Sequence, residues 1–338
     1  MSNLITVSCE FGGRTLTIES GHLAKQADGS VVVKYGDTVV LVTAVSRTTL
    51  NDKIDFFPLT VEFQEKFYAA GRIPGGFLKR EGRPSNDATL ISRMIDRPIR
   101  PLFPEGYLYD TQVVATVLSV DKENDPDVVA SIGASAALHI SSIPFNGPTG
   151  ACKVGRVNGQ LIANPNLEQQ EKGDLDVFIA GTKSSIMMVE GGAHIVPEEQ
   201  VLEAILFGHK QMQPVIQIIE ELQQKIGKSK RVFEAKKIDE SLKAAVEQVA
   251  SPIVQQALKT QDKQERYALY EKAEKDCVQA VVQPNDLDAE KKQKDIKTVI
   301  ETLKYHSMRE MILTQNHRLD GRSSTEIAKL LMGKAKPY

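Results

Sequence analysis

The segment GRIPGGFLKREGRPSNDATLISRMIDRPIRP, residues 71–101, is the most informative stretch of the sequence. Its net charge is +4, whereas the complete chain of 338 residues has a net charge of −2. Guanidinium groups bind phosphate through paired hydrogen bonds, so this concentration of cations predicts a local site for a polyanion. The cations of the segment are Arg72, Lys79, Arg80, Arg83, Arg93, Arg97 and Arg100.

The first half of the segment predicts an exposed loop, because its glycines allow the backbone to approach a ligand closely. Phe77 lies beside Lys79 and Arg80. An aromatic ring next to cations is typical of sites for single-stranded nucleic acid, where the ring stacks on a base and the cations follow the backbone. The candidate residues for binding single-stranded nucleic acid are therefore Phe77, Lys79, Arg80, Arg83, Arg93, Arg97 and Arg100.

The second half predicts a helix. Residues 85–87, Ser-Asn-Asp, supply N-cap chemistry, an apolar stripe follows, and Pro98 is expected to end the helix. Arg93 and Arg97 are four residues apart and share one face. The alternative interpretation is an ordinary solvated helix face beside a flexible loop. Acidic residues do not alternate with these arginines, which favours a binding face.

The chain as a whole predicts an α/β block followed by an all-α block. The Gly-free, charged and periodic stretch 238–313 indicates a helical bundle, and the basic run 225–231 indicates a linker before it. We expect domains at 1–230 and 238–315, with a remnant at 317–338. The expected elements are strands at 31–33, 39–42, 113–120, 176–180 and 185–189, and helices at 127–143 and 197–226.

Several longer strings resemble bacterial polynucleotide phosphorylase: FFPLTVE at 56–62, AAGRIPGGF at 69–77, REGRPS at 80–85 and SRMIDRPIRPLFP at 92–104. The resemblance extends over about residues 1–322. It implies an α/β (α+β) RNase PH-like domain, similar to ribosomal protein S5 domain 2, followed by an all-α helical bundle. Family members carry a second RNase PH-like half and then KH and S1 RNA-binding modules.

The resemblance also implies an activity. Family members degrade single-stranded RNA from its 3′ end, with inorganic phosphate as co-substrate and Mg²⁺ as cofactor, and release nucleoside diphosphates. They form a homotrimeric ring in the cytoplasm and work with RNA-degradation partners such as an endoribonuclease or a helicase, and the loop around Phe77 would lie at the channel constriction. The sequence contains no apolar run that predicts a membrane span and no signal-peptide pattern.

The catalytic half of the family carries a Gly-Asp-x-Asp-x-Lys strand whose carboxylates hold metal. By resemblance, the corresponding residues here are Asp174 and Asp176, with Phe178 at the lysine position and Gln170 where an upstream acid is expected. Phe cannot balance phosphate charge, and Gln is a poor ligand for a hard cation. We therefore assign no catalytic residue and no metal ligand, and expect the Mg²⁺ ligands in the second half.

The run HRLDGR at 317–322 resembles the start of that second half, but 323–338 does not resemble what should follow. A truncated or frameshifted product is therefore expected. Three functions remain open: a polynucleotide phosphorylase chain, a non-catalytic RNA-binding or ring-forming module, and an independent exonuclease that uses Asp174 and Asp176. On chemistry alone, the module is favoured for the 338-residue chain.

Overall fold

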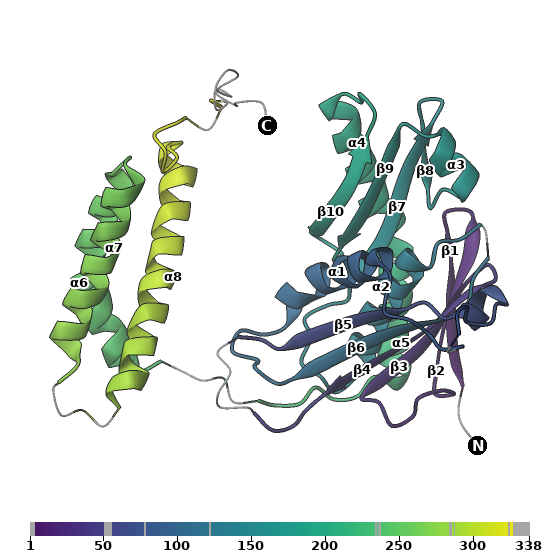
Figure 1. Ribbon diagram of the computed structural model, residues 1–338, viewed down its shortest axis with the longest axis horizontal. Coiled ribbons are helices and arrows are strands. Elements are labelled where there is room, and N and C mark those ends of the chain that lie inside the picture. The colour runs from purple at the N-terminus through teal and green to yellow at the C-terminus, as the bar shows by residue number, and fades with distance from the viewer. Residues whose placement is uncertain are drawn as a thin grey trace. The chain divides into compact units, whose positions relative to one another are not determined.

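The computed structural model describes residues 4–50, 56–77, 79–121, 123–233, 235, 238–283, 286, 288–323 and 325–326. The chain divides into two compact units, residues 1–235 and 236–338 (Figure 1). The first unit contains both sheets, and the second is helical. The expected succession of an α/β block and an all-α block is confirmed.

The first sheet has the strand order β1-β2-β3-β4-β6-β5. Neighbouring strands are antiparallel except β5, which runs parallel to β6 at the edge. The strands expected at 31–33 and 39–42 are confirmed as a hairpin with the register Val33↔Val40 and Gly36 in its turn at φ 60°. The strands are β1 (Ile5–Phe11), β2 (Arg14–Ser20), β3 (Gly29–Tyr35), β4 (Thr38–Ser46), β5 (Leu59–Gln64) and β6 (Thr111–Ser119).

The second sheet is antiparallel, with the order β10-β9-β7-β8. Its two central strands are buried at most positions, and because successive side chains of a strand point to opposite sides, both faces of these strands are largely covered. The strands predicted at 176–180 and 185–189 are confirmed as its neighbours β9 and β10. The strands are β7 (Gly150–Val157), β8 (Gln160–Ala163), β9 (Leu175–Gly181) and β10 (Ile186–Ala193).

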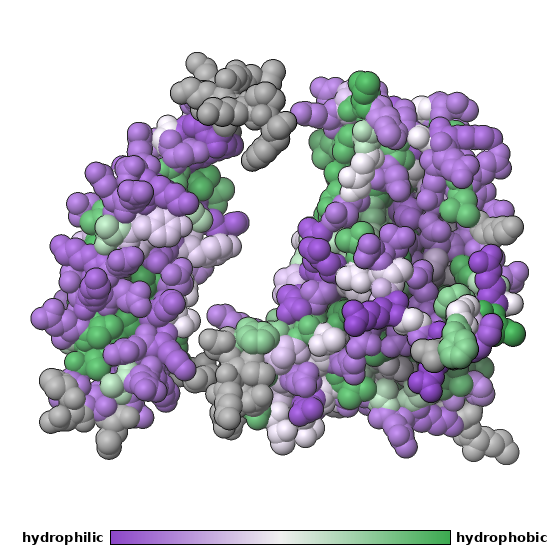
Figure 2. All heavy atoms as spheres, in the orientation of Figure 1, coloured by the Kyte–Doolittle hydropathy of each residue, from purple (hydrophilic) through white to green (hydrophobic). Residues whose placement is uncertain are grey.

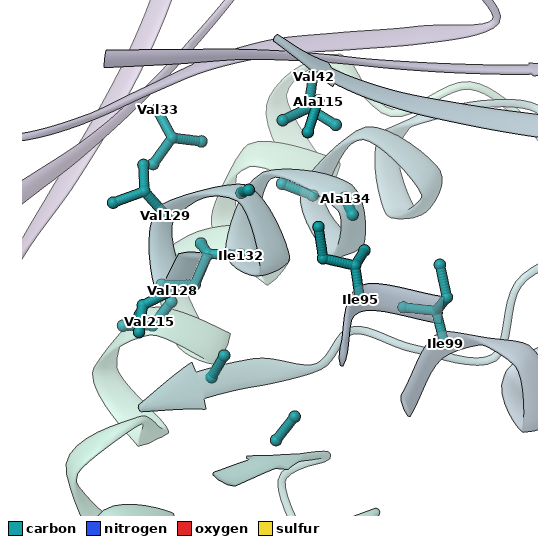
Figure 3. Close-up of a cluster of buried hydrophobic side chains, with 14 of the residues drawn as sticks. Val33, Val42, Ile95, Ile99, Ala115, Val128, Val129, Ile132, Ala134 and Val215 are labelled. Atoms are coloured by element: carbon teal, nitrogen blue, oxygen red, sulfur yellow. The ribbon is translucent and has the colours of Figure 1, made fainter. Parts of the chain in front are cut away.

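Helix α2 (Pro126–Ile140) contacts strands of both sheets, and the core surrounds it. Figure 3 shows its Val129 and Ile132 among side chains from the first sheet, α1 and α5. The helix also comes close to the sheet at Gly133, where a Cβ atom would lie 2.5 Å from Val42 Cγ2. The other helices of the unit are η1 (Phe67–Ala70), α1 (Asn86–Ile99), η2 (Arg100–Leu102), α3 (Leu167–Lys172), α4 (Glu198–Gln211) and α5 (Gln213–Ile226).

Two helix predictions differ from the structure. Helix α1 begins after the Ser85 N-cap as expected, but it continues through Pro98 to Ile99. Proline removes its own backbone hydrogen bond and crowds the carbonyl four residues earlier, but Pro98 lies next to the last residue of the helix and is buried there. The single helix expected over 197–226 is two helices joined at Met212, because Pro214 in the first turn of α5 cannot donate to the preceding turn.

The basic run at 225–231 is not a free linker. The Lys230 ammonium donates hydrogen bonds to the carbonyls of Leu138, His139 and Ser141, each at 2.9 Å. These carbonyls lie at the end of α2, where backbone acceptors lack helical partners and the helix dipole favours a cation. Burial lowers the pKa of Lys230 to about 8. A run of cations in the sequence does not indicate which of them will meet buried carbonyls.

The second unit consists of α6 (Glu240–Lys259), α7 (Lys263–Val281) and α8 (Ala289–Gln315), as the Gly-free periodic stretch predicts. Asp239 and Asp262 cap the first two helices. Its exterior in Figure 2 is mostly hydrophilic, and among the described residues no helix is long and apolar enough to span a membrane. The predicted break at 284–286 and the tail at 323–338 lie largely outside the described residues.

We expect Gly133→Ala to lower the free energy of unfolding by about 1–3 kcal/mol, because the new methyl group must displace Val42 and Val33. The loss should appear even though alanine favours a helix by about 1 kcal/mol. Urea denaturation measures the change. Gly82→Ala is the control, since nothing lies within 4 Å of its Cβ position. Equal stability of the two variants would contradict this account of the helix–sheet contact.

Candidate nucleic-acid interface

The loop at 71–85 presents a bare aromatic ring. Phe77 is 99% exposed, and Ile73 in the same loop is 81% exposed. Burying a phenylalanine is favourable, so a ring that gains nothing from the fold is available to a partner. Gly71 and Gly76 adopt φ values of 66° and 76°, which side chains rarely tolerate, and thereby shape the loop.

The loop covers a cavity of about 900 Å³ between β5, η1 and the start of α1. Four cations line it, and none has an ion-pair partner among the described residues. The acids that line it use their carboxylates on neutral donors: Glu81 accepts from the Phe67 backbone and Glu65 from the Ser85 hydroxyl. The cations therefore remain available to an external anion. They are Lys66, Arg72, Arg80 and Arg83.

Helix α1 extends this cationic surface beyond the cavity. Arg93 is exposed and has no hydrogen-bond or ion-pair partner among the described residues. Arg97 lies one turn further along the helix and forms an ion pair with Glu190 of β10. The opposite face of the helix places Ile95 and Ile99 in the core (Figure 3), which fixes the direction of the arginines.

Arg100 has different surroundings from the other candidates. Its guanidinium donates to both carboxylate oxygens of Asp96, at 2.9 and 2.7 Å. It also donates to the backbone carbonyls of Phe57 and Leu59, at 3.1 Å each. These bonds join α1 to the start of β5, so the Arg100 side chain positions the helix within the fold. Lys79, another of the candidates from the sequence, has an exposed side chain, and its backbone is in the left-handed region with φ 50°.

A second charged cluster lies where α2 begins beside β7. The Lys153 ammonium forms ion pairs with Asp125 and Asp127, each at 2.9 Å. Gln170 donates to the Asp125 carboxylate at 2.9 Å. Burial opposes the charge of Lys153, but Asp127 and Asp125 raise its pKa above the usual value. Burial would raise the pKa of Asp125, yet Lys153 and Gln170 keep it below its usual value.

Asp174, which directly precedes β9, and Asp176 within it do not complete a metal site here. Arg156 donates to both carboxylate oxygens of Asp174. Partial loss of water raises the pKa of Asp176, with Lys153 opposing this and Asp127 adding to it. Within the described ranges, no group of three or more His, Cys, Asp or Glu side chains could hold a metal ion. The Asp174 charge is already balanced by Arg156, so this pair of aspartates does not fit Mg²⁺.

The structure brings into these clusters three cations that are not among the candidate residues chosen from the sequence. Lys66 and Arg72 line the cavity, although Lys66 lies outside the basic segment. Lys153 lies directly opposite Phe178 in the sheet register, so β7 supplies a cation where β9 has a phenylalanine. The detectable signal was a lone lysine in the apolar strand GACKVGRV.

Three protein-family models match the chain. The 3′ exoribonuclease family, domain 1, matches residues 12–144, and domain 2 of that family matches residues 147–211. A third model, polyribonucleotide nucleotidyltransferase, RNA binding domain, matches residues 241–323. Together the models describe the two domains of the 3′ exoribonuclease family, followed by the RNA binding domain of polyribonucleotide nucleotidyltransferase.

Among curated relatives, polyribonucleotide nucleotidyltransferase of Citrifermentans bemidjiense is 51% identical over 322 residues, 95% of this chain and 46% of the relative. The protein of the same name from Heliobacterium modesticaldum is 50% identical over 320 residues, 95% of this chain and 45% of the relative. The chain belongs to the polyribonucleotide nucleotidyltransferase family and spans about half the length of these relatives. The family resemblance and the RNase PH-like fold class are therefore confirmed.

Among solved structures, rice (Oryza sativa) Rrp46 superposes with a TM-score of 0.48 at 13% identity, covering 66% of this chain and 96% of its own.

We expect Lys153→Met to destabilise the protein by about 3–5 kcal/mol at pH 7, because two partly buried carboxylates lose their counter-charge. The raised pKa of Lys153 implies a contribution present below about pH 10.5 and lost as pH rises through its folded value. The lowered pKa of Asp125 implies a contribution present above about pH 4 and lost as pH falls through its folded value.

Urea denaturation between pH 2 and pH 8 measures this cost, which should shrink below about pH 4 as Asp125 becomes protonated. The control is Lys34→Met. The Lys34 side chain is 43% exposed in its pair with Glu19, so this change should cost only about 0–1 kcal/mol. Similar costs for the two variants would contradict the role given to Lys153.

Proposed function

We propose that the chain is the RNA-gripping half of a phosphorolytic 3′-to-5′ exoribonuclease. The observation that supports this most directly is the fully exposed Phe77 ring, in a loop whose cations Arg72, Arg80 and Arg83 have no ion-pair partner in the part of the chain that the structure describes. A base can stack on the ring while phosphates bind the cations. The residues proposed to bind RNA are Phe77, Lys79, Arg80, Arg83, Arg93 and Arg97, with Lys66 and Arg72 in the cavity.

Arg100 is proposed to contribute indirectly, by positioning α1. Its donors are engaged with Asp96 and with backbone carbonyls, so a phosphate would have to compete with four hydrogen bonds. We propose a division of the chain into an RNase PH-like domain at 1–230 and a helical domain at 238–315. The start of a second RNase PH-like half would follow at 317.

For the whole enzyme we propose inorganic phosphate as co-substrate, Mg²⁺ as cofactor, and mRNA degradation in the cytoplasm as a homotrimer. Partners such as an endoribonuclease or a helicase belong to the same proposal. The metal ligands are proposed to lie in the part of the relatives' length that this chain does not match. The cation-balanced carboxylates of Asp125, Asp127 and Asp174 support that assignment.

The same cluster favours a second candidate function for the 338-residue chain by itself, namely a non-catalytic RNA-binding or ring-forming module. Phosphoryl transfer depends on neutralising the charge of the reacting phosphate. Here Lys153 and Arg156 are occupied by aspartates. The chain would then bind RNA without cleaving it.

We expect the purified chain, given single-stranded RNA, Mg²⁺ and inorganic phosphate, to bind the RNA and release no nucleoside diphosphate. Chromatography of the products and RNA binding in the same preparation measure both properties. Phosphate-dependent release would show a working site in this chain and would contradict the assignment of Asp174 and Asp176. Failure to bind RNA would contradict the proposed function itself.

We expect Phe77→Ala to weaken single-stranded RNA binding by about 1–3 kcal/mol, the usual contribution of one stacked base. Fluorescence anisotropy with a labelled oligonucleotide measures the change. Ile73→Ala is the matched control, because Ile73 is an exposed apolar residue of the same loop without an aromatic face. Equal losses in both variants would indicate a general effect on the loop instead of stacking.

A further inference from the structure

The two arginines on the exposed face of α1 differ in one respect. Arg93 has no partner among the described residues, whereas Arg97 forms an ion pair through Nη1 with Oε2 of Glu190. Glu190 lies on β10, an edge strand of the second sheet, and α1 contacts this strand. The two positions are 93 residues apart in sequence. Equivalent helix positions therefore have different electrostatic surroundings.

The pair between Arg97 and Glu190 is open to solvent. The Arg97 side chain is 51% exposed and the Glu190 side chain is 52% exposed. Such exposed pairs contribute little to stability, because water and salt screen both charges. The pair is therefore easily separated, and the fold does not depend on it.

A carboxylate and a phosphate use the same donors of a guanidinium group. A phosphate that binds Arg97 must displace Glu190, and the displaced carboxylate then remains nearby as a repelling negative charge. Arg93 imposes no such exchange. A phosphate would therefore bind Arg97 more weakly than Arg93 and leave it more readily, because Glu190 replaces the departing phosphate.

We infer that Glu190 competes with RNA phosphate for Arg97 and thereby lowers and tunes the affinity of α1 for single-stranded RNA. The inference rests on the proposed RNA-binding function and adds a residue from outside the basic segment. Glu190 affects RNA binding only through its ion pair with the Arg97 side chain, and it does not itself contact the bound strand.

The test is Glu190→Gln, measured by anisotropy with a labelled single-stranded oligonucleotide at low and at moderate salt. The expected result is about a two- to fivefold lower Kd at low salt, the range that one exposed ion pair can supply. The gain should shrink as salt rises, since the competing pair is itself screened. Glu190→Asp, which keeps the charge, should bind as the wild type does.

Repeating the Glu190→Gln measurement in two arginine variants distinguishes competition at Arg97 from a general effect of removing one negative charge. The gain should persist in Arg93→Ala and disappear in Arg97→Ala, while the urea midpoint of Glu190→Gln stays close to that of the wild type. An equal gain in both backgrounds, or none in the wild-type background, would overturn the inference and leave the proposed function standing. Absence of RNA binding by both wild type and Glu190→Gln would overturn both.

Discussion

The first unit depends on the close contact of α2 with the sheet beneath it. Gly133 allows the helix to approach Val33 and Val42 so closely that even a methyl group has no room. Almost every residue of α2 is buried, and the helix contacts strands of both sheets. Because protein interiors are close-packed, this contact fixes the distance between the layers and the places of the elements around them.

The charged clusters of the first unit follow from the two ends of that helix. Near its N-terminus, Asp127 meets the Lys153 ammonium of β7. At its C-terminus, Lys230 satisfies carbonyls that have no helical partners. Both partly buried ammonium groups have partners, which offsets the free-energy cost of removing a charge from water. Residues that resemble a catalytic strand in sequence therefore lie beside a structural ion-pair cluster.

The candidate interface depends on how α1 is divided between core and solvent. Ile95 and Ile99 anchor the helix in the core, and Arg100 ties its end to β5. Arg93 and Arg97 then face outward beside the loop that carries Phe77. The helical unit has a core of its own, which includes Val246, Val254 and Ile296. The family model that matches this unit is described as an RNA binding domain.

The sequence by itself determined the succession of an α/β and an all-α block, several of their elements, the family and the composition of the basic segment, because periodicity, capping residues and long motif strings are local. It could not determine which arginine would remain free. Arg97 meets a glutamate 93 residues away, and Arg100 meets carbonyls 41 and 43 residues away. It also did not foresee that Pro214 would divide a helix or that Lys230 would cap another. Only the tertiary structure decided these points, because ion pairs and caps form between groups that folding brings together.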